Sequence, residues 1–252
     1  MKKLNLQDLT IEITRQCNMS CSHCLRGEPE NVNINIKHVD KLFSKLEHIG
    51  DLTITGGEPS LHPEIIDQIV ESLKKHNVSL DTFYLVTNAK KVTNEFMISV
   101  LNLYSMCDAI DEEFYGGLAI SGDGYHDRLN AENVQRLKAF SFTSIREEGE
   151  QRFDDNLINQ GRSVDNYPSI REVNIYACEI EDNYISETGL YLNCLGDLLP
   201  DGNLSYDTQR EENLIIANVH DKGFNLLNAL KRFNKRIDEG KTVEELIDLE
   251  IA

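Results

Sequence analysis

Residues 9–24 read LTIEITRQCNMSCSHC, an alternation of apolar and polar side chains followed by three closely spaced cysteines. The alternation predicts a half-buried β-strand, and the cysteines follow directly after it. Along the first half of the chain, further strand-like runs alternate with segments whose apolar residues recur at helical spacing. The expected strands are residues 52–55, 81–87 and 117–121, and the expected helices are residues 36–49, 62–76, 93–106 and 127–139. This order predicts a parallel sheet with helical crossovers.

The three cysteines lie within eight residues and can converge on one metal centre if the loop wraps around it. A tetrahedral zinc site needs four ligands, and His23 is a poor fourth because it is adjacent to Cys24. An iron–sulfur cubane held by three cysteines leaves one iron open, as a substrate-binding cluster requires. A zinc knuckle with a distant fourth ligand and a chance group of buried cysteines are the alternatives.

Each expected strand is followed by a loop of unusual chemistry. Because the carboxyl ends of parallel strands meet at one edge of a sheet, we expect these loops to lie together. They are the cysteine cluster, Gly-Gly-Glu-Pro (56–59), Thr-Asn (87–88) and Ser-Gly-Asp-Gly-Tyr-His (121–126).

The second half of the chain is less regular. Residues 141–145 are an expected fifth strand, residues 146–170 a loop or short helix, and residues 173–181 a strand; residues 189–200 form a strand pair and residues 224–237 and 242–250 helices. A closed eight-unit barrel takes ~250 residues, so only about five or six βα units fit here. We therefore expect an α/β fold, an incomplete (β/α)6-type TIM barrel with a C-terminal β-hairpin and helices as a cap. The expected domains are the partial barrel core (1–170) and the cap (171–252).

The composition argues against several kinds of partner and location for the protein. The 252 residues include 25 basic side chains (Lys and Arg) against 43 acidic ones, a net charge of −18. That charge repels polyanions and argues against nucleic acid as a partner. No apolar run reaches the length of a membrane helix and no signal peptide is recognisable, so we expect a cytoplasmic protein without membrane association. Six cysteines in such a chain are expected to be reduced thiols or metal ligands.

Four motifs together resemble the signature of the radical S-adenosylmethionine (radical SAM) superfamily. They are CNMSCSHC (17–24), TGGEP (55–59), VTNA (86–89) and SGDGYHD (121–127), in the family's order and at strand ends. The resemblance implies that Cys17, Cys21 and Cys24 bind a [4Fe–4S] cluster whose fourth iron chelates SAM. It also implies that one-electron reduction cleaves SAM to a 5′-deoxyadenosyl radical, which abstracts a hydrogen atom from substrate.

The resemblance further implies a set of cofactor-binding residues. The two glycines of TGGEP allow close approach to the SAM amine, the glutamate binds that amine or braces the loop, and the proline fixes the turn. Polar side chains on the next two loops suit ribose or carboxylate contacts, and a cation, Arg152 or Arg162, would meet the SAM carboxylate. The expected cofactor-binding residues are Gly56, Gly57, Glu58, Pro59, Asn88, Ser121, Asp123 and Arg162.

Residues 191–206, YLNCLGDLLPDGNLSY, resemble the hairpin that opens the SPASM or twitch extension of some radical SAM enzymes. Cys107, Cys178 and Cys194 are dispersed, so we expect a cluster-free remnant and a single cluster in the protein. Cys178 and Cys194 are either ordinary buried thiols or, for one of them, a catalytic hydrogen-atom donor.

The leading interpretation is a radical SAM enzyme that acts on a peptide or small-molecule substrate. It would receive electrons from a donor such as flavodoxin or ferredoxin. One alternative is an activase that installs a glycyl radical on a partner enzyme. A second, from a different class, is a non-catalytic iron–sulfur or zinc-binding interaction module.

Overall fold

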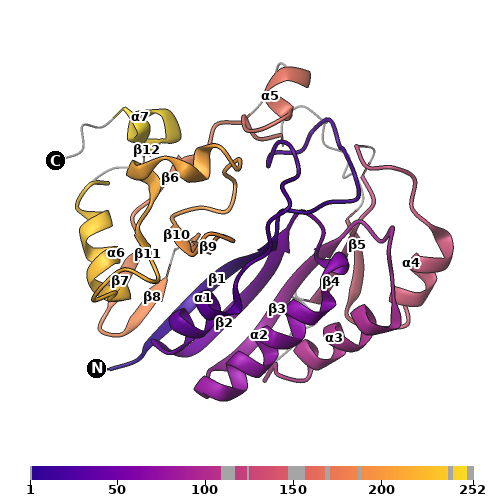
Figure 1. Cartoon of the computed structure of the whole chain (residues 1–252), viewed down its shortest axis with the longest axis horizontal. Helices are drawn as coiled ribbons and strands as arrows, with labels where there is room; N and C mark the ends of the chain where they lie inside the picture. The colour runs from indigo at the N-terminus through magenta and orange to yellow at the C-terminus, as the bar shows by residue number, and fades with distance from the viewer. Residues whose placement is uncertain are drawn as a thin grey trace.

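The computed structural model describes residues 2–108, 117–123, 125–146, 157–167, 171–186, 189–237 and 241–248. Its main feature is one large sheet in the strand order β11-β10-β9-β1-β2-β3-β4-β5 (Figure 1). The central strands β1 (Leu4–Thr14), β2 (Leu46–Gly56), β3 (Ser79–Thr87), β4 (Gly117–Ser121) and β5 (Thr143–Arg146) pair in parallel. The crossover helices are α1 (Ile36–Phe43), α2 (Pro63–His76), α3 (Asn94–Tyr104) and α4 (Ala131–Leu137). The expected partial barrel is thereby confirmed, with β1 to β5 as its consecutive parallel strands in the described part of the chain.

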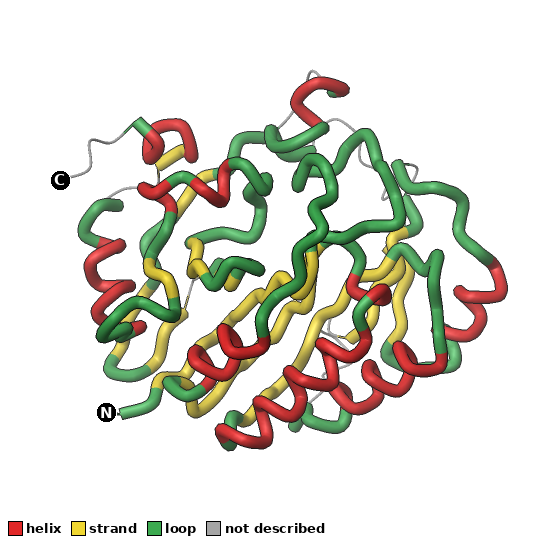
Figure 2. Tube along the Cα trace, in the orientation of Figure 1, coloured by secondary structure: helices red, strands yellow, loops and turns green. Residues whose placement is uncertain are grey.

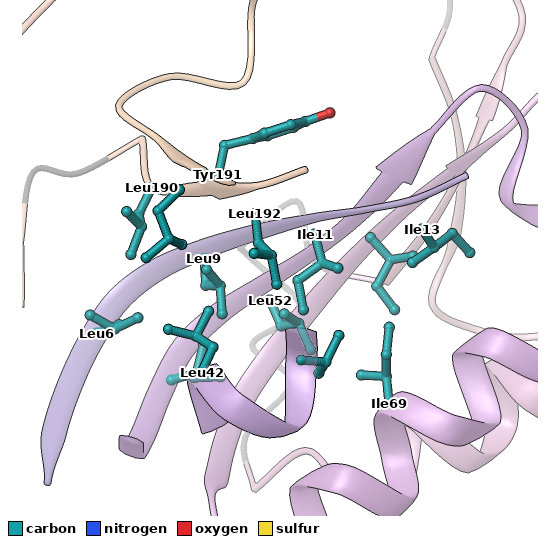
Figure 3. Packing of buried hydrophobic residues seen from close by; sticks show 14 of the residues in the cluster. Leu6, Leu9, Ile11, Ile13, Leu42, Leu52, Ile69, Leu190, Tyr191 and Leu192 are labelled. Carbon is teal, nitrogen blue, oxygen red and sulfur yellow. The ribbon is translucent and has the colours of Figure 1, made fainter. Parts of the chain in front are cut away.

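The two faces of the parallel sheet differ in chemistry because successive side chains of a strand alternate. Leu9, Ile11 and Leu52 are fully buried and pack with Leu42 and Ile69 between the sheet and the helices (Figure 3). Figures 1 and 2 show α1, α2 and α3 along that side. The opposite face of the same strands is therefore left for polar side chains.

That opposite face carries a row of polar residues in register. Thr10 pairs with Thr53 across β1 and β2, and Thr53 pairs with Tyr84 across β2 and β3. At the far edge, Ser121 of β4 pairs with Arg146 of β5. A closed barrel would fill this concave face with apolar layers, whereas the open sheet leaves it free to line a binding site.

The first expected helix is shorter than the sequence predicts. It ends at Phe43, and β2 begins at Leu46, within the range assigned to the helix. Leu46 and Ile49 have helical spacing from Leu42, but both are fully buried in β2. Leu46 pairs there with β1, and Ile49 pairs with β1 on one side and β3 on the other. This non-local pairing outweighs the local pattern.

The C-terminal part extends the same sheet beyond β1. The strands β9 (Tyr191–Leu192), β10 (Asp197–Leu199) and β11 (Ala217–Asn218) are joined in antiparallel pairs, and β9 runs parallel to β1. The expected hairpin is thus present, as a continuation of the barrel sheet. Helices α6 (Leu226–Asn234) and α7 (Val243–Ile247) lie beside it (Figure 1). None of the helices in the described ranges is long and apolar enough to cross a membrane.

The expected strand over residues 173–181 is two separate strands. β6 (Asn174–Ile175) pairs with β12 (Lys241–Thr242), and β7 (Glu179–Glu181) pairs with β8 (Tyr184–Ser186). β8 also pairs with the beginning of β1. The remaining described elements are the short helix α5 (Ser163–Asn166) and the 3-10 turns η1 (Pro59–Leu61), η3 (Thr208–Arg210) and η4 (Glu212–Leu214).

Candidate functional site

A cavity of about 740 Å³ opens at the carboxyl ends of the parallel strands, a volume within the range of small-molecule sites. All the loops singled out in the sequence contribute to its wall. The expected site residues that line it are Cys17, Cys21, Cys24, Gly56, Gly57, Glu58, Pro59, Asn88, Ser121 and Asp123. The sequence did not identify Thr10, Thr53, Thr55, Tyr84 and Arg146 from the concave face, or Gly189, Asp201, Gly202 and Asn203 from the C-terminal part. The residues of the concave face could have been found from the alternation of polar and apolar side chains along their strands. Those of the C-terminal part lie in loops next to strands.

The three cysteine thiols are free and partly buried. Burial and the neighbouring thiols Cys24 and Cys17 raise the pKa of Cys21 to about 11. Burial also raises the pKa of Cys17. A metal binds the thiolate form, so metal binding here would release protons.

Gly56 and Gly57 allow the loop after β2 to lie directly on the chain that leads into the cysteines. A Cβ atom on Gly56 would lie 2.2 Å from the carbonyl oxygen of Thr14, and one on Gly57 would lie 2.1 Å from that of Gln16. Because neither residue has a Cβ, the backbones come close enough for the N–H of Gly57 to donate to the carbonyl oxygen of Thr14 at 2.7 Å. The backbone of Thr14 and Gln16 therefore leaves no room for a side chain at either glycine.

The buried carboxylate of Glu58 joins the ends of β2 and β3. It accepts hydrogen bonds from the N–H of Ser60 (3.0 Å), the hydroxyl of Thr87 (2.7 Å) and the N–H of Asn88 (2.8 Å). The side chain of Asn88 in turn donates to Asn18 of the cysteine loop at 2.8 Å. Glu58 thus braces the loop, and Thr87 and Asn18 are partners that the sequence did not reveal.

The loop after β4 forms an aromatic and acidic group with the cysteine loop. Asp123 accepts from the N–H of Tyr125 (3.1 Å) and lies 2.5 Å from Nδ1 of His126. The ring of His23 lies 4.8 Å from those of both Tyr125 and His126. Burial, and then the charge of His126, lower the pKa of His23 to about 4, so this imidazole is neutral at pH 7.

The arginines that line the cavity are not the ones that the sequence pointed to. Arg146, at the end of β5, lines the cavity, as does the half-buried Arg26, whose guanidinium donates to the carbonyl of Leu204 at 2.6 Å. Arg162 is absent from the cavity wall; it lies beside the cysteine loop and is 3.3 Å from Glu28. Arg152 lies outside the described residues.

The thiols of Cys178 and Cys194 lie outside the cavity wall. Cys178 contacts Asn234 of α6, whose side-chain oxygen accepts from its N–H at 3.2 Å. Cys194 is 3% exposed, and its thiol donates to the backbone carbonyl of Glu12 at 3.3 Å. Burial raises the pKa of both thiols. Their contacts are those of packing residues.

A buried polar network, unforeseen in the sequence, connects β1 to the C-terminal part. The fully buried Arg15 donates to Glu12 at 2.7 Å, to Glu30 at 3.0 Å and to Gln209 at 2.6 Å. Glu12 also accepts from the hydroxyl of Tyr191 at 2.7 Å. In Figure 3 the Tyr191 ring points away from the helix side of β1. The network holds the C-terminal strands against the chain that leads into the cysteine loop.

The residues present fit an iron–sulfur cluster with bound SAM. Three soft thiol donors share one cavity wall, which suits iron–sulfur ligation and leaves a fourth iron without a cysteine from this loop. The Nδ1 atom of His23, a residue of the same wall, is buried and has no hydrogen-bond partner within the described part of the chain. A polar ligand in the cavity would satisfy such an atom.

A family model for the radical SAM superfamily matches residues 11–144, just over half of the chain. The solved structure of anSMEcpe with bound AdoMet and Cp18Cys peptide has a TM-score of 0.54 at 12% identity. That match covers 92% of this chain and 82% of anSMEcpe, and it shows the shared fold.

Two curated proteins match shorter stretches. A GTP 3',8-cyclase of Chlorobaculum tepidum is 30% identical over 82 residues, which is 31% of this chain and 24% of the cyclase. An uncharacterized protein of Methanocaldococcus jannaschii is 23% identical over 93 residues, 36% of this chain and 32% of that protein. The chain therefore spans about a quarter and about a third of the lengths of these two relatives.

Proposed function

The chain belongs to the radical SAM superfamily of enzymes, and we propose that it binds one [4Fe–4S] cluster at Cys17, Cys21 and Cys24. When bound, the reduced cluster and SAM would supply a 5′-deoxyadenosyl radical that abstracts hydrogen from substrate. The observation that carries the proposal is the convergence of the three thiols and the GGEP loop on one cavity wall.

The residues of the chain would act by binding and orienting. Gly57 and Glu58 would shape the loop that faces the SAM amine. Their hydrogen bonds fix it against the chain that leads into the cysteines and against the loop after β3. Asn88, Ser121 and Asp123 are the proposed polar contacts to the rest of SAM.

Arg146 is the proposed partner of the SAM carboxylate in place of Arg162. It lies on the cavity wall, next to Ser121 in the sheet register, whereas Arg162 does not line the cavity. A guanidinium can bind a carboxylate through two parallel hydrogen bonds.

The proposed substrate is a peptide, with a small molecule as the alternative. anSMEcpe, which shares the fold, is seen with a bound peptide, whereas the GTP 3',8-cyclase is named for a nucleotide. Gly189, Asp201, Gly202 and Asn203 of the C-terminal part also line the cavity, and we propose that substrate is selected there. A cytoplasmic flavodoxin or ferredoxin is the proposed electron donor.

Anaerobic reconstitution followed by reduction in the presence of SAM tests this function. We expect about four irons per chain, since a cubane holds four, and formation of 5′-deoxyadenosine. A Cys17→Ala, Cys21→Ala, Cys24→Ala triple variant is the matched control and should form none. Zinc in place of iron, or a full cluster without any 5′-deoxyadenosine from bound SAM across peptide and nucleotide substrates, would favour the interaction module and contradict the proposal.

A further inference from the structure

Residues 157–167 form a strap beside the cysteine loop, with α5 at its end (Figure 1). The backbone N–H of Arg162 donates to the carbonyl oxygen of Cys24 at 3.0 Å. The side chain of Asn166 donates to the carbonyl oxygen of Ser22 at 3.1 Å, and the hydroxyls of Tyr167 and Ser22 are 2.7 Å apart. The strap is therefore bonded to the loop between the second and third cysteines as well as at the third.

Gly161 brings the strap into backbone contact with the loop. Its φ of 57° is in the left-handed region, and a Cβ there would lie 2.4 Å from the carbonyl oxygen of Leu25 and 2.5 Å from the nitrogen of Gly27. No other residue type fits this approach. The position of Gly161 fixes the next residue, Arg162, close to the cysteine loop.

The guanidinium of Arg162 is held there without a strong counterion among the described residues. Its side chain is 17% exposed, and its recorded ion-pair partner, Glu28 at 3.3 Å, is 78% exposed. The Nε atom is buried and has no hydrogen-bond partner in the described ranges. Burial raises the pKa of the Cys17 and Cys21 thiols, and the charge of Arg162 is a smaller contribution that lowers the pKa of both.

We propose that Arg162 supplies a positive charge beside the cysteine loop that stabilises the reduced state of the bound cluster and so raises its reduction potential. The inference rests on the proposed function, because it requires a cluster at the three cysteines. Reduction adds one electron to a cluster that already has three thiolate ligands, and a nearby cation in a partly desolvated site favours the more negative state. Charge and hydrogen bonding around a cluster are established determinants of its potential.

The test compares Arg162→Gln, which removes the charge, with Arg162→Lys, which keeps it. Arg232→Gln, an exposed residue of α6, removes the same charge elsewhere in the chain. Each reconstituted protein is assayed for iron and sulfide and then titrated with dithionite, which dissociates into two one-electron reductants, while the reduced cluster is followed by electron paramagnetic resonance. We expect a more negative midpoint potential for Arg162→Gln, and potentials near that of the parent for Arg162→Lys and Arg232→Gln.

Equal shifts in the Lys and Gln variants, or no shift in Arg162→Gln at full iron content, would overturn the inference and leave the proposed function intact. A parent protein that assembles no cluster would overturn both. If Arg162→Gln folds but assembles no cluster, Arg162→Lys decides: a cluster in the Lys variant supports the charge, and its absence shows that the side chain acts by packing.

Discussion

The hydroxyl of Thr87 donates a 2.7 Å hydrogen bond to the carboxylate of Glu58, which connects the ends of two neighbouring parallel strands. The same carboxylate accepts from the backbone of Ser60 and Asn88. Both of its oxygens are therefore used inside the protein, at 2% exposure of the residue. The glutamate of the GGEP loop shapes the cavity wall through these bonds.

Glu58→Gln should destabilise the protein. Glutamine offers one accepting oxygen and one NH2 donor, so either the hydroxyl of Thr87 or the N–H of Asn88 loses its acceptor. A buried unsatisfied donor costs about 1–3 kcal/mol, which urea unfolding would measure. Glu71→Gln, whose parent side chain is 72% exposed, is the control and should leave the unfolding free energy unchanged. An unfolding free energy for Glu58→Gln equal to that of the control would refute the bracing role.

Arg15→Met should cost about 3–5 kcal/mol, because it leaves the buried carboxylate of Glu12 without its charge partner. Burial alone would raise the pKa of Glu12, but the charges of Arg15 and Arg26 lower it. A lowered pKa stabilises the fold above the unfolded-state value and loses that contribution as the pH falls through the folded value. Thermal unfolding followed from about pH 7 down to about pH 3, through and below the ordinary glutamate pKa of about 4.3, measures the loss.

Arg210→Met provides the comparison for Arg15→Met. Arg210 reaches the other oxygen of the same Glu30, but its side chain is 44% exposed. We expect it to cost less than about 1 kcal/mol, as exposed ion pairs do. Similar losses in the two variants would show that the buried network contributes no more than a surface pair.

Asp51→Asn should stabilise the protein at neutral and alkaline pH. Burial, and then the charge of Asp8, raise the pKa of Asp51 to about 6. Because the folded pKa is above the unfolded one, the ionised carboxylate destabilises the fold. The cost is absent below the unfolded pKa, grows as the pH rises towards the folded pKa, and is complete above it.

The expected gain for Asp51→Asn at pH 8 is about 1–2 kcal/mol, after allowance for solvent screening of a partly exposed group. Urea unfolding at pH 8 and pH 5 measures it, with a smaller gain at pH 5. The exposed Glu47 of the same strand, changed to Gln, is the control. A gain that is independent of pH would show that the effect of Asp51→Asn is one of packing.

Cys178→Ala and Cys194→Ala should both leave iron content and 5′-deoxyadenosine yield close to those of the parent. Neither thiol lines the cavity, and each is bonded to a partner in the C-terminal part or β1. Chromatographic assay of 5′-deoxyadenosine and substrate product checks this. Loss of product in one variant, with SAM cleavage retained, would establish that cysteine as the hydrogen-atom donor.

Much of the candidate site could be predicted from local sequence patterns. The cysteine loop, the GGEP loop and the loops after β3 and β4 follow strands that are visible as alternating or β-branched runs. Parallel strands with crossover helices have only one edge at which such loops can meet, so their convergence followed from chain order. The boundary between α1 and β2 did not, because Leu46 and Ile49 satisfy a helical pattern locally. Both residues instead join the sheet, Leu46 by pairing with β1 and Ile49 by pairing with β1 and β3.

By itself, the sequence determined the parallel α/β core and the residues that converge at its carboxyl edge, because both depend on periodicities within a few residues. Only the tertiary structure decided that Arg146 and Arg26 line the cavity, whereas Arg162 lies beside the cysteine loop. It also decided that Arg15 bonds Gln209, 194 residues away. Such contacts depend on how segments that are distant in the sequence pack together, and the spacing of residues along the chain does not determine that packing.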